Sequence, residues 1–386
     1  IIVFIWLGAF LFGLSFGGYV ANYEGEPLSV IGATWARDHG LGSVVAVAEN
    51  FYYSNIDKVE AGGVPKISAQ VEPKNPQISG PTSKAEIESG LTIVAPPHLS
   101  PPNNIPSPVS AGDVLPGEGI WEPVGSRVDG VPALYATRVR PDATYTSQLA
   151  SLMWIDTKLT QAMFVPGYQE PTGSPNPYGG ALPSSYQARL LANFNGAFRL
   201  ADSQGGYYYN GVEVAPLTMG IASTVIYKDG TIKVGVWGRD VGMDNNVAVV
   251  RQNLHLIIDS GVSQVSDGEG FAWGATTHGE NLAWRSAIGQ RSDGSIVYVG
   301  SPGLSAGSMA NTLVKAGVQR AMVLDMNDWW VAGFYFTHTA NGTPVCHKLD
   351  PDVAEGCDRF LNEYKRDSFH FLAKPGLKVQ GETKTP

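Results

Sequence analysis

Two aspartates and an asparagine lie close together after an apolar run of the chain, in the stretch VLDMNDWW (residues 323–330). Asp325 and Asp328 form a candidate carboxylate pair for acid–base chemistry, and Asn327 provides a hydrogen-bonding amide. Trp329, with the tryptophan after it, provides a flat apolar surface on which a sugar ring can stack. The tryptophans could equally line an apolar wall, so these residue types indicate a candidate ligand site. The alternative is a strand-to-loop cap with both tryptophans in the core.

The element that must position Asp325 is the run VQRAMVL (318–324), which we predict to be a buried strand. Ligand sites in α/β sheets commonly form beyond the carboxyl ends of strands. The preceding stretch SAGSMANTLVKAG (305–317) predicts a helix, with Ser305 or Ser308 as its N-cap and a glycine at its end. Asp325 is therefore expected at the end of a strand, where a side chain can reach a ligand.

One motif points to a different chemistry. GLSAG (303–307) matches the nucleophile elbow of serine hydrolases, and Asp325 and His338 follow in the order acid, then histidine. However, Ser305 is sufficiently explained as a helix N-cap, and the repeated strand–helix alternation of such enzymes is lacking. We therefore disfavour a serine hydrolase.

Two further clusters contain chemically useful side chains. Arg285, in NLAWRSAIGQRSDG, has the planar fork that suits a phosphate or carboxylate, although a lone arginine more often forms a surface salt bridge. Asn195 precedes Gly196 in ANFNGAF, which places an amide beside a flexible backbone position or forms a simple turn.

Turn signals and short apolar runs predict the fold. Asp229-Gly230 and Asp293-Gly294 each lie between alternating runs, which is typical of β-hairpins. Strands around a few helices favour an α+β class. We predict a strand-rich, mixed-sheet globular domain with a few packed helices, preceded by an N-terminal transmembrane helix and a Pro-rich spacer.

The N-terminal third of the chain predicts attachment to a membrane. Residues 1–20 contain no charged side chain, and about 20 apolar residues can span a bilayer as a helix, although a buried core helix is the alternative. We divide the chain into five regions: an anchor (1–21), a partly helical juxtamembrane segment (22–63), a Pro/Ser/Asn-rich spacer (64–114), a globular domain (115–373) and a tail (374–386).

Charge and cysteine usage restrict the compartment and the partners. The net charge of −9 argues against a nucleic-acid partner, which would require a basic face. Ten residues, Pro and Gly among them, lie between Cys346 and Cys357, which favours a disulfide in an oxidising compartment; two buried thiols are the alternative. We expect the globular domain on the extracytoplasmic side of the cell membrane.

The order of several motifs resembles the phosphodiester glycosidase family over roughly residues 185–372. The motifs are NFNGAF (193–198), WGRDVGM (237–243), VRQNLHLIIDSG (250–261), WRSAIGQRSDG (284–294) and GLSAGSMANTLVKAGVQRAMVLD (303–325). The stretch DRFLNEYKRDSFHFLAKPG (358–376) also resembles the end of membrane-anchored bacterial members. This chain departs from the family after Asp325, where MNDWW replaces a glycine-rich loop.

The resemblance implies a hydrolase of sugar phosphodiesters or related glycans of the cell envelope. It implies catalytic roles for Asp325, Arg285 and Asn195. The candidates for substrate binding are Asn327, Asp328, Trp329, Arg239, Asp240 and Asn253. No metal-ligand spacing is present, but carboxylates and amides near Asp325 leave a divalent cation such as calcium open. The alternative function is a non-catalytic glycan-binding or scaffolding module of a membrane complex.

Overall fold

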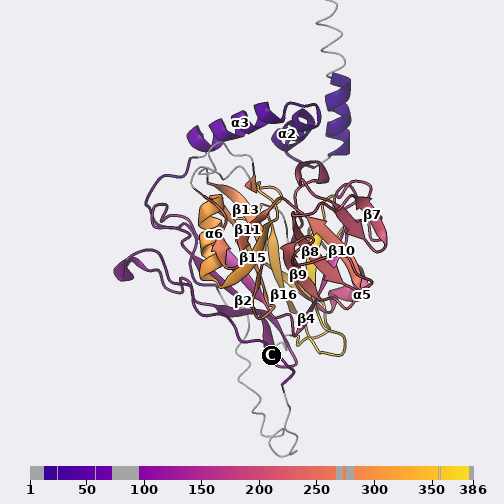
Figure 1. Ribbon diagram of the computed structural model, residues 1–386. Coiled ribbons are helices and arrows are strands. Elements are labelled where there is room, and N and C mark those ends of the chain that lie inside the picture. Colours follow the sequence, from indigo (N-terminus) through magenta and orange to yellow (C-terminus); the bar gives the residue numbers. More distant parts are fainter. Residues whose placement is uncertain are drawn as a thin grey trace, which may run out of the picture.

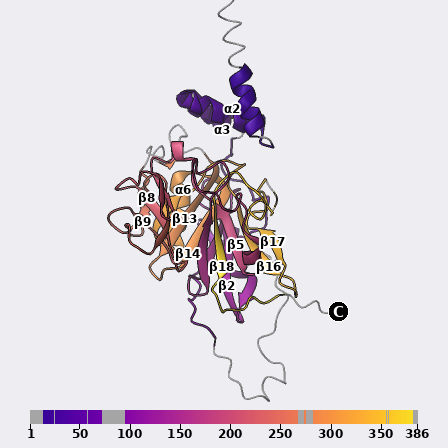
Figure 2. The ribbon, with the colours of Figure 1, turned by 90° about the vertical axis from the view of Figure 1, so that its right-hand side faces the viewer.

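The computed structural model describes residues 13–23, 25–56, 58–71, 95–266, 273–274, 282–354, 356 and 358–381. Three antiparallel sheets build the body, and two helices lie across one end of it (Figures 1 and 2). Besides the helical residues 13–22, the described helices are α2 (Leu28–Asp38), α3 (Gly42–Asn55), the short α5 (Ser184–Gln187) and α6 (Ala306–Lys315), with 3-10 turns at Ala111–Asp113 and Leu200–Asp202. The strand-rich α+β prediction is confirmed.

The largest sheet has eight strands and contains the run before Asp325. In spatial order its strands are β1 (Glu122–Val128), β2 (Val131–Val139), β3 (Ala150–Ile155), β14 (Ile296–Leu304), β13 (Ala283–Arg291), β15 (Val318–Val323), β11 (Leu256–Asp259) and β12 (Val262–Ser263). Both predicted hairpin turns are confirmed, one joining β13 to β14 and the other joining β8 to β9 in the next sheet.

Two five-stranded sheets complete the body. One has the order β7 (Val212–Ala215), β6 (Tyr207–Tyr209), β10 (Val247–Gln252), β8 (Ala222–Tyr227) and β9 (Ile232–Val236). The other has the order β17 (Pro344–Lys348), β16 (Gly333–His338), β5 (Leu190–Asn195), β18 (Ser368–Ala373) and β4 (Thr160–Val165).

The prediction of mixed sheets is wrong, because every paired strand among the described residues is antiparallel to its neighbour. A strand–helix–strand unit such as β14–α6–β15 can join two neighbouring parallel strands. Both strands instead pair with β13, which lies between them. The helical crossover therefore joins two strands that are parallel to each other without being neighbours.

Strand β15 is buried on both faces, which explains its continuous apolar sequence. Met322 and Leu324 belong to the core that the eight-stranded sheet shares with the two smaller sheets. Ala321 and Val323 belong to a second core, which helix α6 covers on the other face. Helix α6 begins as predicted at Ser305, whose side chain and that of Ser308 form a reciprocal capping box. The strand that leads to Asp325 is thus held firmly from both sides.

Both flanks of the segment predicted as a spacer contact the body. Val71 and Ile105 are buried, and the Leu99 amide donates to Asp156 Oδ2 at 2.7 Å. Residues 72–94 lie outside the described part of the chain. The limits predicted for the spacer and for the domain after it stay predictions.

Residues 13–22 are helical, and residues 1–12 of the predicted anchor lie outside the described residues. Within the part that the structure describes, no helix is long and apolar enough to cross a membrane. The transmembrane helix therefore stays a prediction.

Candidate functional site

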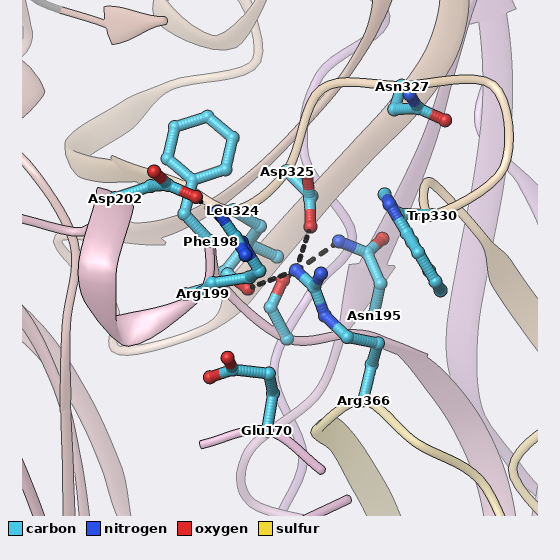
Figure 3. Close-up of polar contacts among 12 residues, drawn as sticks. Glu170, Asn195, Phe198, Arg199, Asp202, Leu324, Asp325, Asn327, Trp330 and Arg366 are labelled. Atoms are coloured by element: carbon cyan, nitrogen blue, oxygen red, sulfur yellow. Dashed lines mark hydrogen bonds and ion pairs between the residues drawn. The ribbon is translucent and has the colours of Figure 1, made fainter. Parts of the chain in front are cut away.

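Asp325 lies two residues beyond the end of β15, and its side chain is almost completely buried (Figure 3). The hydroxyl of Ser286 on the neighbouring strand accepts a hydrogen bond from the Asp325 amide and donates one to the Asp325 carbonyl, both at 3.1 Å. Asp325 Oδ1 accepts a hydrogen bond from the Met326 amide at 2.8 Å, and Oδ2 forms an ion pair with Arg366 Nη2 at 2.7 Å. The carboxyl group is therefore fixed in position by both its main chain and its side chain.

Burial raises the pKa of Asp325 from 3.8 to about 7, because the charged form is poorly solvated. The positive charge of Arg366 and the Met326 amide act in the opposite direction. Both protonation states of the carboxyl group are therefore accessible near neutral pH. A carboxyl group of this kind is suited to general acid or general base catalysis.

Asp325 borders a cavity of about 260 Å³ between the body and the two N-terminal helices. Helices α2 and α3, with the residues between them, are called the cap below. The body contributes Phe198, Arg199, Asp202, Gln204, Leu254, Gly274, Asp325, Met326, Asn327, Trp330 and Arg366. The cap contributes Val30, Ala33, Thr34, Arg37, Glu49 and Tyr53.

The cavity walls carry three arginines, each paired with a carboxylate. Arg366 pairs with Asp325, as described above. Arg199 pairs with Asp202 at 2.9 Å and reaches up to Asp38 of the cap, also at 2.9 Å. Arg37 pairs with Glu49 at 2.6 Å within the cap. An anionic ligand could exchange places with these carboxylates, because arginine binds phosphate and carboxylate groups in similar geometry.

Asn195 does not line this cavity, although the sequence suggested a catalytic role. Its side-chain oxygen accepts hydrogen bonds from the Tyr298 hydroxyl at 2.9 Å and the Ala332 amide at 3.1 Å. Its nitrogen donates to the Ser286 hydroxyl at 3.0 Å and to the Gly196 carbonyl at 2.9 Å. The geometry makes Asn195 a positioning residue, which holds the serine that fixes the Asp325 backbone.

Arg285 is also absent from the cavity wall and is fully buried. Its Nε donates to the Leu304 carbonyl at 2.9 Å and its Nη1 to the Trp273 carbonyl at 3.1 Å. The sulfur of Met326 lies 3.8 Å from the same Nη1, and burial lowers the pKa of Arg285 to about 10. Arg285 thus lies behind the loop that carries Met326.

The loop after Asp325 contributes two of its polar or aromatic side chains to the cavity, Asn327 and Trp330. Asn327 has a φ of 155°, which residues other than glycine rarely adopt, and its Oδ1 accepts a hydrogen bond from the Trp329 amide. Trp330 lies with its ring 4.7 Å from the Arg366 guanidinium. Trp329 and the exposed Asp328, predicted to bind substrate, are not among the lining residues.

The other predicted binding residues lie elsewhere or act through the backbone. Arg239 and Asp240 form a surface ion cluster with Asp259, away from the residues that line the cavity. Asn253 is fully buried, and its nitrogen donates to the carbonyls of Val323 and Leu324 at 2.8 and 3.0 Å. It therefore secures the end of β15 just before Asp325.

Sequence reasoning missed Arg366, the ion-pair partner of Asp325. Its signal was the adjacent pair Arg366-Asp367 directly before a β-type run. Asp367 forms a fully buried ion pair with Arg251 at 2.8 Å. A β-carbon on Gly196 would lie 2.3 Å from the Asp367 side chain, so only glycine fits there. The glycine of NFNGAF is thus required by a carboxylate beside the site.

The serine hydrolase alternative is not supported by the geometry. The Ser305 hydroxyl accepts a hydrogen bond from the Ser308 amide as the cap of α6, whereas His338 contacts Ser126 at 3.0 Å. No group of three or more metal-ligating side chains occurs among the described residues. The calcium ion that the sequence left open therefore stays a prediction. Cys357 lies outside the described residues, so its disulfide with Cys346 also stays a prediction.

Comparison with known proteins supports the resemblance drawn from the motifs. Residues 188–325 match the model of the phosphodiester glycosidase family, so the predicted resemblance is confirmed. No curated protein sequence matches the chain. The match to the family model ends at Asp325.

Three solved structures are similar to parts of the chain. The zebrafish N-acetylglucosamine-1-phosphodiester alpha-N-acetylglucosaminidase catalytic domain, auto-inhibited by its pro-peptide, is 14% identical, with a TM-score of 0.41 over 64% of this chain and 86% of that one. A hypothetical protein from Synechocystis is 10% identical, with a TM-score of 0.36 over 64% of each chain. A putative exported protein from Burkholderia pseudomallei is 12% identical, with a TM-score of 0.30 over 59% of this chain and 75% of that one. These low scores carry no argument about the site.

Proposed function

We propose that this chain, whose residues 188–325 match the phosphodiester glycosidase family, is a hydrolase of sugar phosphodiesters or related glycans of the cell envelope. The observation that carries the proposal is the buried carboxyl group of Asp325, paired with Arg366 at the wall of an arginine-bearing cavity. A carboxyl group and a nearby cation are what hydrolysis of an anionic glycoside requires.

The chemistry of such a bond needs few catalytic groups. If the bond between the sugar C1 and its oxygen breaks, the leaving group is a phosphomonoester, which is stable as an anion near neutral pH. It therefore needs compensation of its charge more than a proton. Water completes the reaction by adding its oxygen to C1, and one of its protons must be removed.

The residues of the cavity can be assigned to these tasks. Asp325 in its ionised form stabilises the positive charge that develops at C1 or takes a proton from the attacking water. Arg366, which the sequence reasoning had not included, compensates the phosphate charge in place of Arg285. Arg199 lies on the same cavity and provides a second cation. Trp330 offers an apolar face beside Arg366 for the sugar ring.

We also propose that the domain is attached to the cell membrane and lies on its extracytoplasmic side. The uncharged residues 1–20 and the spacing of Cys346 and Cys357 support this location. An envelope glycan or sugar phosphodiester is then the partner available to the cavity, and a second protein of a membrane complex is a further candidate.

Hydrolysis by the full chain in detergent tests the proposed activity. Sugar-1-phosphodiesters and isolated envelope polymer serve as substrates, and product analysis for free sugar and phosphomonoester identifies the broken bond. We expect Asp325→Asn to reduce kcat by at least about 100-fold, the usual contribution of an acid–base group. Asp328→Asn, which removes an exposed carboxylate from the same loop, is the matched control and should retain activity.

A binding or scaffolding role is the second candidate, favoured by the loop after Asp325. Met326 and Asn327 place side chains at the cavity where glycines would leave the backbone open. No turnover of any substrate, together with polymer binding that requires Trp330, would refute the enzyme and support this role.

A further inference from the structure

Helix α3 presents two different faces. Val45, Glu49 and Tyr53, spaced four residues apart, face the body: Val45 is buried, and the other two line the cavity beside Asp325. Val44, Val47 and Phe51 lie on the outer side and are 61%, 65% and 60% exposed. Because residues three and four apart share one face of a helix, these three side chains form a single stripe.

The outer side of α3 carries these three apolar side chains and no charged one, and the small polar side chains of Ser43 and Asn55 are exposed beside them. Glu49 is the only charged residue in the sequence of α3, and it points to the cavity. Further exposed apolar side chains of the cap lie at both ends of α3 and on α2, namely Leu28, Leu41, Tyr52 and Ile56. Contiguous apolar patches of this kind mark surfaces that contact another molecule or a membrane. We call these residues, with Val44, Val47 and Phe51, the outer cap surface.

The neighbouring segment identifies what covers this surface. Residues 13–22 are helical and run from the cap away from the body, as both views show (Figures 1 and 2). This helix carries no charged residue, and the sequence before it is uncharged as well. Leu14 on it is 60% exposed. A second element with an exposed apolar side chain thus leaves the cap on the side that faces away from the body.

We propose that the outer cap surface lies on a lipid bilayer, with α3 parallel to the membrane plane and the Asp325 cavity on its inner side. Aliphatic side chains together with the aromatic Phe51 and Tyr52 suit the boundary between headgroups and acyl chains. No lysine or arginine belongs to the surface, so apolar burial drives the contact and attraction to anionic lipids does not. The contact thus requires neither negatively charged lipid nor low salt.

A polarity-sensitive fluorescent label tests whether the outer cap surface lies on the bilayer. The full chain is labelled in detergent and then transferred into phosphatidylcholine vesicles. Val47→Cys and Phe51→Cys place an NBD label on the outer cap surface. Val262→Cys is the matched control, because Val262 is also a valine and is 62% exposed. The amide of the preceding residue, Gly261, donates a hydrogen bond to the Gln319 carbonyl at the start of β15. Val262 therefore lies near the end of β15 that is opposite Asp325. Spin labels on the lipid acyl chains quench a label that enters the bilayer.

We expect blue-shifted emission and at least about twofold quenching at positions 47 and 51, with neither effect at position 262. The quenching should persist between about 0.05 and 0.5 M salt, because no charged pair holds the surface to the lipid. A chain that binds vesicles while its position 47 label stays in water would overturn the proposal. The proposal would also be overturned if the chain did not bind vesicles, or if quenching at positions 47 and 51 equalled that at position 262. It would be overturned too if self-association without lipid buried the labels at positions 47 and 51. Circular dichroism confirms that each labelled variant is folded.

Discussion

Replacing Asp325 by asparagine should change how the stability of the protein depends on pH. In the folded chain the pKa of Asp325 is raised from 3.8 to about 7, so folding favours the protonated form. The stabilisation this provides is complete below about pH 4 and is lost as the pH rises to about 7. The shift of about 3 pH units corresponds to about 4 kcal/mol, at 1.36 kcal/mol for each unit. The side chain is only 6% exposed, so solvent screening reduces this figure little.

The assay is denaturant unfolding of the wild type and Asp325→Asn at several pH values from about 4 to 7. Buried groups that do not interact with Asp325, such as His370, contribute equally to both proteins and cancel in the difference. The free energy of unfolding of the wild type should fall relative to the variant by about 4 kcal/mol over this range. A difference that stays constant with pH would refute the raised pKa, and with it the acid–base role of Asp325.

Two further substitutions probe the surroundings of Asp325. Arg366→Gln removes the cation that lowers the pKa of Asp325, so the pH at which kcat/KM rises with ionisation of that carboxyl group should increase. An unshifted pH profile would show that Arg366 does not influence the ionisation of Asp325. Gly196→Ala places a methyl group against Asp367 and should lower the free energy of unfolding by about 3 kcal/mol or more, because it disturbs a buried ion pair. Gly242→Ala, which has open space around it, is the control and should be nearly neutral in thermal unfolding. Equal stability of the two alanine variants would contradict the close contact.

The elements that place Asp325 could be predicted because their signals are local. The apolar run of β15, the capping serine of α6 and the two Asp-Gly turns each depend on a few adjacent residues. The pairing of strands could not be predicted in this way. The insertion of β13 between β14 and β15 is a long-range choice, and it turned an expected mixed sheet into an antiparallel one.

The candidate site was predicted in its centre and missed at its rim. Asp325 could be found because it ends a buried strand. Arg366 lies 41 residues further along the chain, and Arg37 and Glu49 come from the N-terminal cap, so no sequence spacing connects them with it. Asn195 and Arg285 have residue types that suit catalysis, but hydrogen bonds to the interior occupy them. Residue type alone cannot distinguish a side chain that touches a ligand from one that holds its neighbour.

Helix α3 is a single layer of chain between the cavity and the outer surface, which links the two sides. A ligand that displaces Glu49 and Tyr53 from the cavity wall also moves Val47, because all three side chains belong to the same helix. Linked equilibria are reciprocal, so such a ligand weakens the contact at the outer surface by the same factor by which that contact weakens the ligand. Through α3, the proposed lipid contact at the outer cap surface thus changes the apparent affinity of the Asp325 cavity for its ligand.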